Sequence, residues 1–277
     1  MPDIKVVRLI NGVLIREGAG VKLHRYIGVE RTNDFEPLLL FDYFDSNNPM
    51  DFMAGFPPHP HRGFETITYL LAGSITHEDN KGHKGVIGAG DVQWMTAGKG
   101  IVHSEMPSSE SGCLKGMQLW LNLPAAEKMG APRYQEILSS QLPLEKNEFG
   151  SVTKVIAGKT DKGTTSPIKD IATNPLFFDI TLPIDASVQQ HIPDNYEAVL
   201  LVILGAVWVG EQLVEQGVLA KLSAGKVITL KGGKNSQCVL IAAMKLHEPI
   251  VRHGPFVMNT EAEVMQALDD FRSGKFQ

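Results

Sequence analysis

Residues 56–71 read Phe-Pro-Pro-His-Pro-His-Arg-Gly-Phe-Glu-Thr-Ile-Thr-Tyr-Leu-Leu, and this stretch decides the fold. Its second part, Glu65 to Leu71, is rich in Thr, Ile and Tyr, residues that favour β-strands. Similar runs recur along the chain, and Gly, Pro, Asn and Asp separate them at short intervals. Many short strands with Gly-rich turns predict an all-β sandwich or barrel. The other predicted strands are Asp91 to Thr96, Lys115 to Leu123, Leu176 to Leu182, Val199 to Leu204 and Val227 to Leu230.

One helix is predicted, near the C-terminus. Asn259-Thr260 offers an N-cap, and the acidic residues Glu261 and Glu263 follow it in the first turn. Gly274 would end the helix. The apolar residues that recur at helical spacing are Val264, Ala267, Leu268 and Phe271.

Length and charge limit the class of protein. At 277 residues the chain fits one large all-β unit or two domains of ordinary size. The net charge of −5 argues against a dedicated nucleic-acid binder, because such a protein needs a basic face to displace the counterions of phosphate. We therefore expect no direct contact with nucleic acid, although a partner protein that binds DNA stays open.

Cysteine use and hydropathy predict a cytoplasmic protein. Cys113 and Cys238 are isolated, which fits a reducing compartment better than a secreted fold built on disulfides. Residues 1–5 contain no basic region followed by a long apolar run, so no signal peptide is predicted. The longest apolar stretch, Ala198 to Val209, is broken by Gly205 and is too short to span a bilayer. We expect no membrane contact, and the lack of a long amphipathic surface helix favours a monomer.

Two pairs of polar residues have the spacing of metal ligands on β-strands. His59 and His61 lie on one strand face if their segment is extended. His103 and Glu105 have the same spacing and follow a Gly-rich turn, so two strands would each supply two inward ligands. Three neutral imidazoles and one carboxylate suit a first-row divalent metal. The alternative is that these residues are packed or capped in a β core; spacing and strand context favour the metal site.

The ligand set favours Fe(II) without excluding other ions. If two coordination positions remain open, substrate and O2 could bind side by side on iron. Zn, Mn, Cu and Ni also accept imidazole and carboxylate ligands, so ligand type alone does not decide among them.

The two halves of the chain repeat one pattern, which predicts a duplicated β-barrel. We expect an N-terminal metal-binding domain at 1–130 and a C-terminal domain at 131–277, with a tail, 255–277, that could pack back on the N-terminal domain. In this alignment the second copy keeps only the first of the four polar residues, so one copy alone could hold a metal. The aligned pairs are Gly205 on Gly73, His191 on His59, Pro193 on His61, Tyr196 on Phe64, Glu197 on Glu65, Gly225 on Gly90, Gly233 on Gly98, Cys238 on His103 and Leu240 on Glu105.

Three motifs carry a family resemblance that covers nearly the whole chain. They are residues 56–66, quoted above; residues 91–107, Asp-Val-Gln-Trp-Met-Thr-Ala-Gly-Lys-Gly-Ile-Val-His-Ser-Glu-Met-Pro; and residues 253–260, His-Gly-Pro-Phe-Val-Met-Asn-Thr. Together they resemble the pirin family of the cupin superfamily. The resemblance implies two stacked cupin (jelly-roll) barrels with iron in the N-terminal one. By the family pattern the ligands fall on His59, His61, His103 and Glu105.

The same resemblance implies a function. Activity known in the family is the oxidative opening of the flavonol quercetin by O2, with carbon–carbon cleavage and loss of carbon monoxide. The leading hypothesis is therefore a metal-dependent dioxygenase acting on a flavonol-like, small aromatic substrate. The main alternative is a non-enzymatic iron or redox sensor that binds a transcription factor or a metabolic enzyme; a third is an enzyme whose natural substrate is not a flavonoid. A cupin fold does not choose among them.

The residues around the four ligands have expected roles of their own. We interpret Glu105 as a ligand in preference to a catalytic base, although a carboxylate that swings off the metal could accept a proton. Glu65 is interpreted as a structural group or as a carboxylate that orients a ligand imidazole. Arg62 should point to the opposite face and form a structural ion pair in preference to a substrate contact.

Aromatic and histidine residues near the motifs are weighed in the same way. Phe56 and Trp94, with Phe44 and Met53, could line a pocket for a flat substrate, although plain core packing is the more common use of such residues. His77 and His83 flank a polar hairpin, and we expect both to be solvated residues at its tip.

Overall fold

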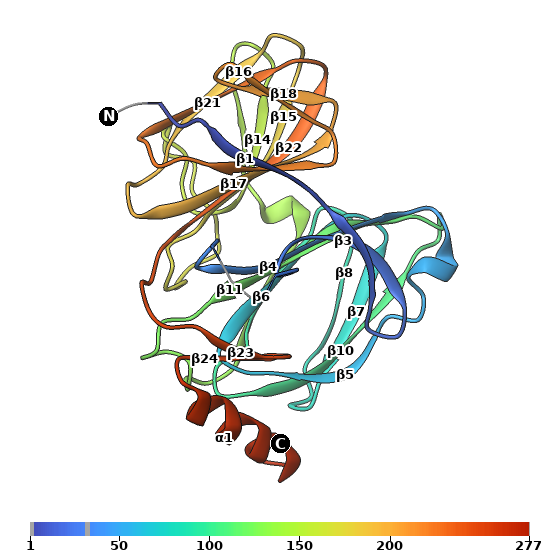
Figure 1. Ribbon diagram of the computed structural model, residues 1–277. Coiled ribbons are helices and arrows are strands. Elements are labelled where there is room, and N and C mark those ends of the chain that lie inside the picture. The colour runs from blue at the N-terminus through green and yellow to red at the C-terminus, as the bar shows by residue number, and fades with distance from the viewer. Residues whose placement is uncertain (1–2, 31–33, 277) are drawn as a thin grey trace. The chain divides into compact units, whose positions relative to one another are not determined.

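The computed structural model describes residues 3–30 and 34–276, which fall into two compact units (Figure 1). Residues 13–139 and 246–277 form one unit, called the histidine unit below. Residues 1–12 and 140–245 form the second unit. This division is discontinuous in sequence. The sequence alone suggested a boundary after residue 130 and a tail, 255–277, that could pack back on the N-terminal domain. Residues 246–277 follow the second unit along the chain yet belong to the histidine unit.

Two antiparallel sheets enclose the interior of the histidine unit. The seven-stranded sheet has the order β12-β9-β6-β11-β4-β3-β2, and the four-stranded sheet has the order β5-β10-β7-β8. The strands are β2 (Val13–Glu17), β3 (Val21–Ile27), β4 (Leu38–Ser46), β5 (Phe56–His61), β6 (Phe64–Ala72), β7 (Ser74–Asp79), β8 (Lys84–Ile87), β9 (Val92–Thr96), β10 (Ile101–Ser108), β11 (Leu114–Asn122) and β12 (Arg133–Ile137), with a 3-10 turn η1 (Pro49–Asp51).

The core of this unit comes from both sheets, as in a jelly-roll barrel. Leu70 of β6 and Leu114 of β11 project from the larger sheet, and Ile75 of β7 and Ile87 of β8 project from the smaller one into a single buried cluster. Side chains alternate between the two faces of a strand, so the same alternation that buries Leu70 also turns Thr68 into the barrel. The barrel interior is thus apolar around Leu70 and polar around Thr68.

The second unit repeats this topology. Its sheets have the orders β1-β20-β17-β22-β15-β14-β13 and β16-β21-β18-β19. Its elements are β1 (Val6–Asn11), η2 (Ser139–Gln141), which begins at the last residue of the histidine unit, β13 (Leu144–Lys146), β14 (Val152–Ala157), β15 (Leu176–Leu182), β16 (Ser187–His191), β17 (Tyr196–Leu204), β18 (Ala206–Val209), β19 (Gln212–Glu215), β20 (Val218–Leu222), β21 (Val227–Gly232) and β22 (Ser236–Met244). The prediction of an all-β chain with two cupin-type barrels is confirmed.

The register expected for the repeat is wrong in its second part. Cys238 lies on β22, which pairs with β15 and β17 and is therefore the counterpart of β11, not of the strand that carries His103. The counterpart of β10 is β21, whose inward residues Ile228 and Leu230 are buried in an apolar core. His191 is exposed and its Nδ1 lies 2.7 Å from Asp161 Oδ2. The alignment failed because it inserted three residues after the hairpin, whereas the second unit has fewer residues there: β21 begins at 227 and β18 at 206, while β10 begins at 101 and β7 at 74.

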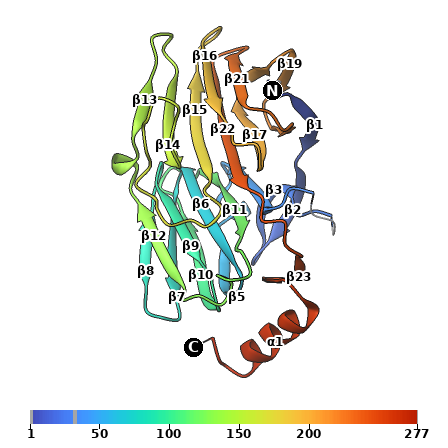
Figure 2. The ribbon, with the colours of Figure 1, turned by 90° about the vertical axis from the view of Figure 1, so that its left-hand side faces the viewer.

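The C-terminal segment forms a short hairpin and the predicted helix. Strands β23 (Val251–His253) and β24 (Phe256–Met258) pair with each other, and α1 spans Glu261–Arg272 (Figure 2). Thr260 is the N-cap: its hydroxyl accepts from the Glu263 N–H, and the Glu263 carboxylate accepts from the Thr260 N–H, a capping box. Gly274 takes a positive φ of 75° where the chain leaves the helix. No helix in residues 3–30 and 34–276 is long and apolar enough to cross a membrane.

A buried lysine joins this segment to the barrel. The Lys128 side chain is 1% exposed, and its Nζ donates to the Gly63 carbonyl at 2.7 Å, to Asn122 Oδ1 at 2.6 Å and to the Val257 carbonyl at 3.0 Å. All of these acceptors are neutral oxygens, and burial lowers the pKa of Lys128 to about 8. Residue 63 must be glycine here, because a Cβ would lie 2.0 Å from the Val257 carbonyl oxygen.

Replacing Lys128 by Met should lower the free energy of unfolding by roughly 2–4 kcal/mol, since three buried acceptors lose their donor. Because the folded-state pKa of Lys128, about 8, lies below its ordinary 10.5, the unfolded chain binds its proton more tightly. The wild-type free energy of unfolding should therefore rise, relative to Lys128→Met, as pH increases from about 8 to 10.5. Urea denaturation of both proteins across that range measures the difference, and a difference independent of pH would contradict this assignment.

Candidate metal centre

Strands β5 and β10 bring three histidines together. The two strands lie side by side (Figure 1). They pair antiparallel with His59 opposite His103, and His61 lies two residues further along β5 on the same face. One ring nitrogen from each histidine lies within 4.8 Å of those of the other two. The ring centroids are 4.5 Å apart for His59 and His103, 4.7 Å for His59 and His61, and 5.0 Å for His61 and His103.

Burial keeps these imidazoles neutral, which is the form that binds a metal. His61 and His103 are 3% and 1% exposed. Loss of solvation lowers the pKa of His103 to about 4 and holds that of His61 well below its ordinary value, with the neighbouring histidines acting in the same direction on His61. Both residues therefore offer uncharged ring nitrogens at neutral pH.

The ring nitrogens also lack the partners that a purely structural role would require. His103 Nδ1 and Nε2 are both buried without a hydrogen-bond partner, a costly arrangement in a β core. His59 Nδ1 lies 2.8 Å from the Pro57 carbonyl oxygen. This contact fixes the ring and leaves Nε2 to bind a metal. A divalent cation shared by the three rings would bind one nitrogen of each, so the residues present fit a bound metal.

Glu105 lies beside the cluster with its carboxylate held by other residues. The β5–β10 register shifts after His103, so that Glu105 pairs with Phe56. Gln118 Nε2 donates to the two carboxylate oxygens at 3.1 and 3.0 Å, and the Thr68 hydroxyl donates at 3.3 Å. The carboxylate is not part of the three-histidine cluster. The structure thus joins three of the four predicted ligands directly and places the fourth on the same face of β10.

A small cavity opens next to Glu105. Aromatic and aliphatic side chains form its walls, and polar groups lie at one end; the lining residues are Leu23, Asp42, Phe44, Phe56, Thr68, Ile75, Glu105 and Gln118. The enclosed space has room for about one water molecule. The ring of Phe56 lies 6.4 Å from that of His59, so the cavity and the histidine cluster are neighbours. Of the predicted pocket residues, Phe56 and Phe44 line this cavity.

Glu65 and Trp94 lie on the other face of the larger sheet. The Thr96 hydroxyl donates to Glu65 Oε1 at 2.6 Å, and burial raises the pKa of Glu65 to about 7. Trp94 is the cross-strand neighbour of Ile67, which shares the Glu65 face, whereas Thr68 on the alternate face contacts Glu105. Neither residue lines the cavity.

Arg62 points away from the histidines into an ion pair, as expected. Its Nη1 donates to Asp270 Oδ2 at 2.9 Å, and its Nε donates to the Lys99 carbonyl at 2.6 Å. The side chain is 4% exposed, so this is a buried contact and not a surface one.

His77 is the residue that sequence reasoning misplaced. It was expected to be solvated at a hairpin tip, but it is 2% exposed and is the cross-strand neighbour of Glu105. Gln93 Nε2 contacts its ring nitrogens, Glu136 Oε1 lies 3.1 Å from its Nε2, and Tyr134 stacks on the ring at 5.3 Å. The alternation of Ile75 and His77 along β7 was the signal that it faces inward. His83 is exposed.

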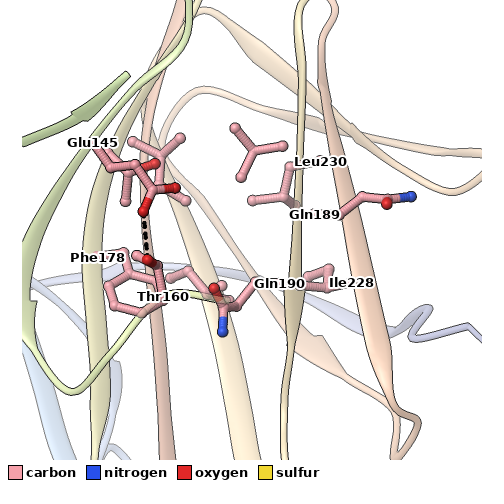
Figure 3. Close-up of a pocket in the computed structure, with 11 residues that line it drawn as sticks. Glu145, Thr160, Phe178, Gln189, Gln190, Ile228 and Leu230 are labelled. Carbon is pink, nitrogen blue, oxygen red and sulfur yellow. Dashed lines mark hydrogen bonds between the residues drawn. The ribbon is translucent and has the colours of Figure 1, made fainter. Parts of the chain in front are cut away.

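The second unit has a cavity at the corresponding place, but no ligand cluster. Figure 3 shows Glu145 and Thr160, which form a hydrogen bond, together with Phe178, Ile228 and Leu230. Gln190 pairs with Ile228 across the strands as His59 pairs with His103. Within the described residues, the three histidines are the only cluster of His, Cys, Asp and Glu that could hold a metal. The expectation that one barrel alone carries metal ligands remains a prediction.

The fold and this cluster define a bicupin protein with a candidate metal centre in one barrel. The sequence model of the pirin family matches residues 20–121, and the sequence model of the pirin C-terminal cupin domain matches residues 177–277. A pirin-like protein of Caulobacter vibrioides is 43% identical over 276 residues, covering all of both chains. The chain belongs to the pirin family.

Solved structures agree with this assignment. The crystal structure of quercetin 2,3-dioxygenase from Acinetobacter baumannii matches with a TM-score of 0.91 and 33% identity, covering 99% of each chain. The bacterial pirin YhhW of Escherichia coli, solved in complex with nickel(II), matches with a TM-score of 0.65 and 20% identity over 87% of this chain and 99% of that one. The second likeness shows the fold alone.

Replacing His103 by Ala should abolish tight binding of one Ni(II) per chain, because a buried imidazole leaves the cluster. Wild-type protein at a free metal concentration 100 times its Kd should gain about 2.7 kcal/mol of stability, and the variant should gain almost none. His83→Ala is the matched control, since its ring is exposed and outside the cluster. Thermal unfolding with and without metal measures the effect; equal stabilisation of His103→Ala and wild type would rule out this site.

Proposed function

We propose that this protein is a metal-dependent dioxygenase that opens flavonols such as quercetin with O2. The observation that carries the proposal is the position of a carboxylate, Glu105, beside the three-histidine cluster, in which His61 and His103 are buried and neutral, and beside a cavity with aromatic walls. Similarity to the A. baumannii structure titled quercetin 2,3-dioxygenase supports it. The reaction consumes one flavonol and one O2 and releases carbon monoxide with the ring-opened ester, so the atoms balance without another reductant.

The metal ligands in this proposal are His59, His61, His103 and Glu105, and Fe(II) is the favoured ion. When bound, the metal would offer coordination positions to the substrate oxygens and to O2, while the flavonol itself would supply the electrons that reduce O2. Zn, Mn, Cu and Ni suit the same donors. The nickel(II) found in the E. coli pirin makes Ni(II) a useful probe of the site, since it is stable in air.

The remaining groups would bind and orient the substrate. Phe44 and Phe56 offer flat apolar surfaces for an aromatic ring. Gln118 and Thr68 donate to the Glu105 carboxylate and hold it in place. This carboxylate would accept the proton of the reacting hydroxyl, a second role besides metal coordination. Asp42 also lines the cavity, and its two oxygens accept from Arg25 at 2.8 and 2.7 Å. The remaining lone pairs of this carboxylate would accept hydrogen bonds from phenolic hydroxyls.

The small size of the cavity favours a second function, that of a non-enzymatic sensor. Its room for about one water is far too small for a flavonol, so substrate entry requires the walls to move. A non-enzymatic iron or redox sensor needs no such opening, because a change of iron charge would act through the surrounding protein on a surface that binds a transcription factor or a metabolic enzyme. This alternative predicts metal binding without turnover.

Protein reconstituted anaerobically with Fe(II) should take up O2 when quercetin is added, with loss of the flavonol absorbance. His61→Ala should show neither change, because it removes a ligand from the centre. An oxygen electrode and an absorbance trace measure the two signals together, and carbon monoxide release confirms ring opening. No uptake by wild-type protein that holds one metal per chain would favour the sensor.

Gln118→Leu should lower kcat roughly 10- to 100-fold with a smaller change in KM, because Glu105 loses the donor that orients it. Glu105→Gln should lower kcat further and weaken metal binding. Gln237→Leu is the matched control: Gln237 Nε2 donates to the two Asp179 oxygens at 2.9 and 3.0 Å in the second unit, the same arrangement away from the centre. Steady-state kinetics on metal-loaded proteins separate the variants, and equal kcat for Gln118→Leu and wild type would exclude this role.

A further inference from the structure

The residue that follows His61 is bound by the C-terminal segment. The Arg62 N–H donates to the Pro255 carbonyl at 3.2 Å, and the Val257 N–H donates to the Arg62 carbonyl at 3.1 Å. Its guanidinium donates to Asp270 of α1 and lies 4.4 Å from the centre of the Phe276 ring. The C-terminal segment thus fixes both the backbone and the side chain of Arg62, although it lies about 200 positions away in sequence.

The strand that carries His103 is held by the same segment. Val102 N–H donates to Asn80 Oδ1 at 3.1 Å, and the Asn80 N–H donates to the Val102 carbonyl at 2.9 Å. Asn80 Nδ2 in turn donates to the Phe276 carbonyl. The Val102 side chain packs on the buried cluster formed by Phe256, Ala267 and Phe276. The tail therefore contacts the residues next to two of the three histidines.

Asp270 is the electrostatic centre of these contacts. Besides Arg62, it accepts from Lys275 Nζ at 2.9 Å and from Gln266 Nε2 at 2.8 Å. Hydrogen bonds from Lys275, Arg62 and Gln266 hold the pKa of Asp270 well below its ordinary value, so the carboxylate is ionised at neutral pH. Arg62 is almost fully buried, so losing this partner would leave an uncompensated charge behind β5.

We propose that residues 255–276 act as a clasp that positions His61 and His103, and that Asp270 is a positioning residue for the metal centre. The inference rests on the proposed metal centre and adds a part of the chain that lies outside it. Ligand atoms must be held within roughly 0.5 Å of their places for tight binding, and the supporting contacts determine that precision. Docking of the clasp and binding of the metal are then coupled, and each strengthens the other by the same free energy.

This coupling provides a mechanism for the alternative function, that of a non-enzymatic iron or redox sensor. A partner protein that competes for the clasp would weaken metal binding, and a metal that binds more tightly would hold the clasp in place. The structure shows the docked arrangement of the clasp, and the sensor would require a second, released one.

The first experiment compares Asp270→Asn with Asp269→Asn. Asp269 is the adjacent residue, but its side chain is 66% exposed and its ion pair with Arg272 at 3.9 Å lies on the surface of α1. Ni(II) affinity, measured by competition with a chromophoric chelator, should fall roughly 10- to 100-fold in Asp270→Asn. It should be unchanged in Asp269→Asn. Equal affinity of Asp270→Asn and wild type would overturn the clasp.

The second experiment needs no variant and so does not depend on the folding of Asp270→Asn. Amide hydrogen exchange of wild-type protein is followed with and without Ni(II). Slower exchange in 261–276 on metal binding, beyond that of the second-unit strand β17, supports the coupling. No change in 261–276, from protein shown to bind Ni(II), overturns it. If wild-type protein binds no Ni(II), the metal centre fails and the clasp fails with it, so the two failures are distinguishable.

Discussion

The antiparallel pairing of β5 with β10 is the constraint on which the histidine unit depends. It sets His59 opposite His103, and the two-residue period of a strand then brings His61 to the same face. A shift of β5 by one residue in this register would turn His59 and His61 to the face opposite His103. The pairing also fixes Glu105 next to Phe56, where Gln118 and Thr68 reach its carboxylate. Burial then keeps His61 and His103 neutral, so the strand pairing determines both the position and the protonation of these two rings.

Much of the fold and the three-histidine cluster could be predicted from the sequence because local rules decide them. Strand positions follow from runs of β-branched and aromatic residues, and the cluster follows from spacing: His59 and His61, like His103 and Glu105, are two apart. His77 was misplaced because its polar neighbours resemble a loop, although alternation continues through it to Asp79. Glu65 and Trp94 could not be assigned to a face until the cross-strand register was known. The contacts of Arg62 with α1 join residues far apart in sequence, which no local pattern reveals.

The interiors of the two barrels differ in how much they contribute to the stability of the fold. In the second unit the matching interior holds Ile228 and Leu230, which pack without any unsatisfied polar group. In the histidine unit the position of Ile228 carries His103, whose two ring nitrogens are buried without partners. An apolar interior is more favourable for stability, since each buried polar group without a partner is unfavourable. A bound metal would offset part of this unfavourable free energy.

The interleaved order of the two units has a consequence for biosynthesis. Residues 246–277 complete the histidine unit, yet the ribosome makes them after all of the second unit. Domains generally fold as they emerge during synthesis, so the second unit can close while the histidine unit still lacks its final segment. The nascent chain would thus carry β5 and β10 through most of translation without the contacts that Arg62 and Lys128 make to residues 255–276. Assembly of the histidine unit is therefore expected to finish only after the whole second unit has been synthesised.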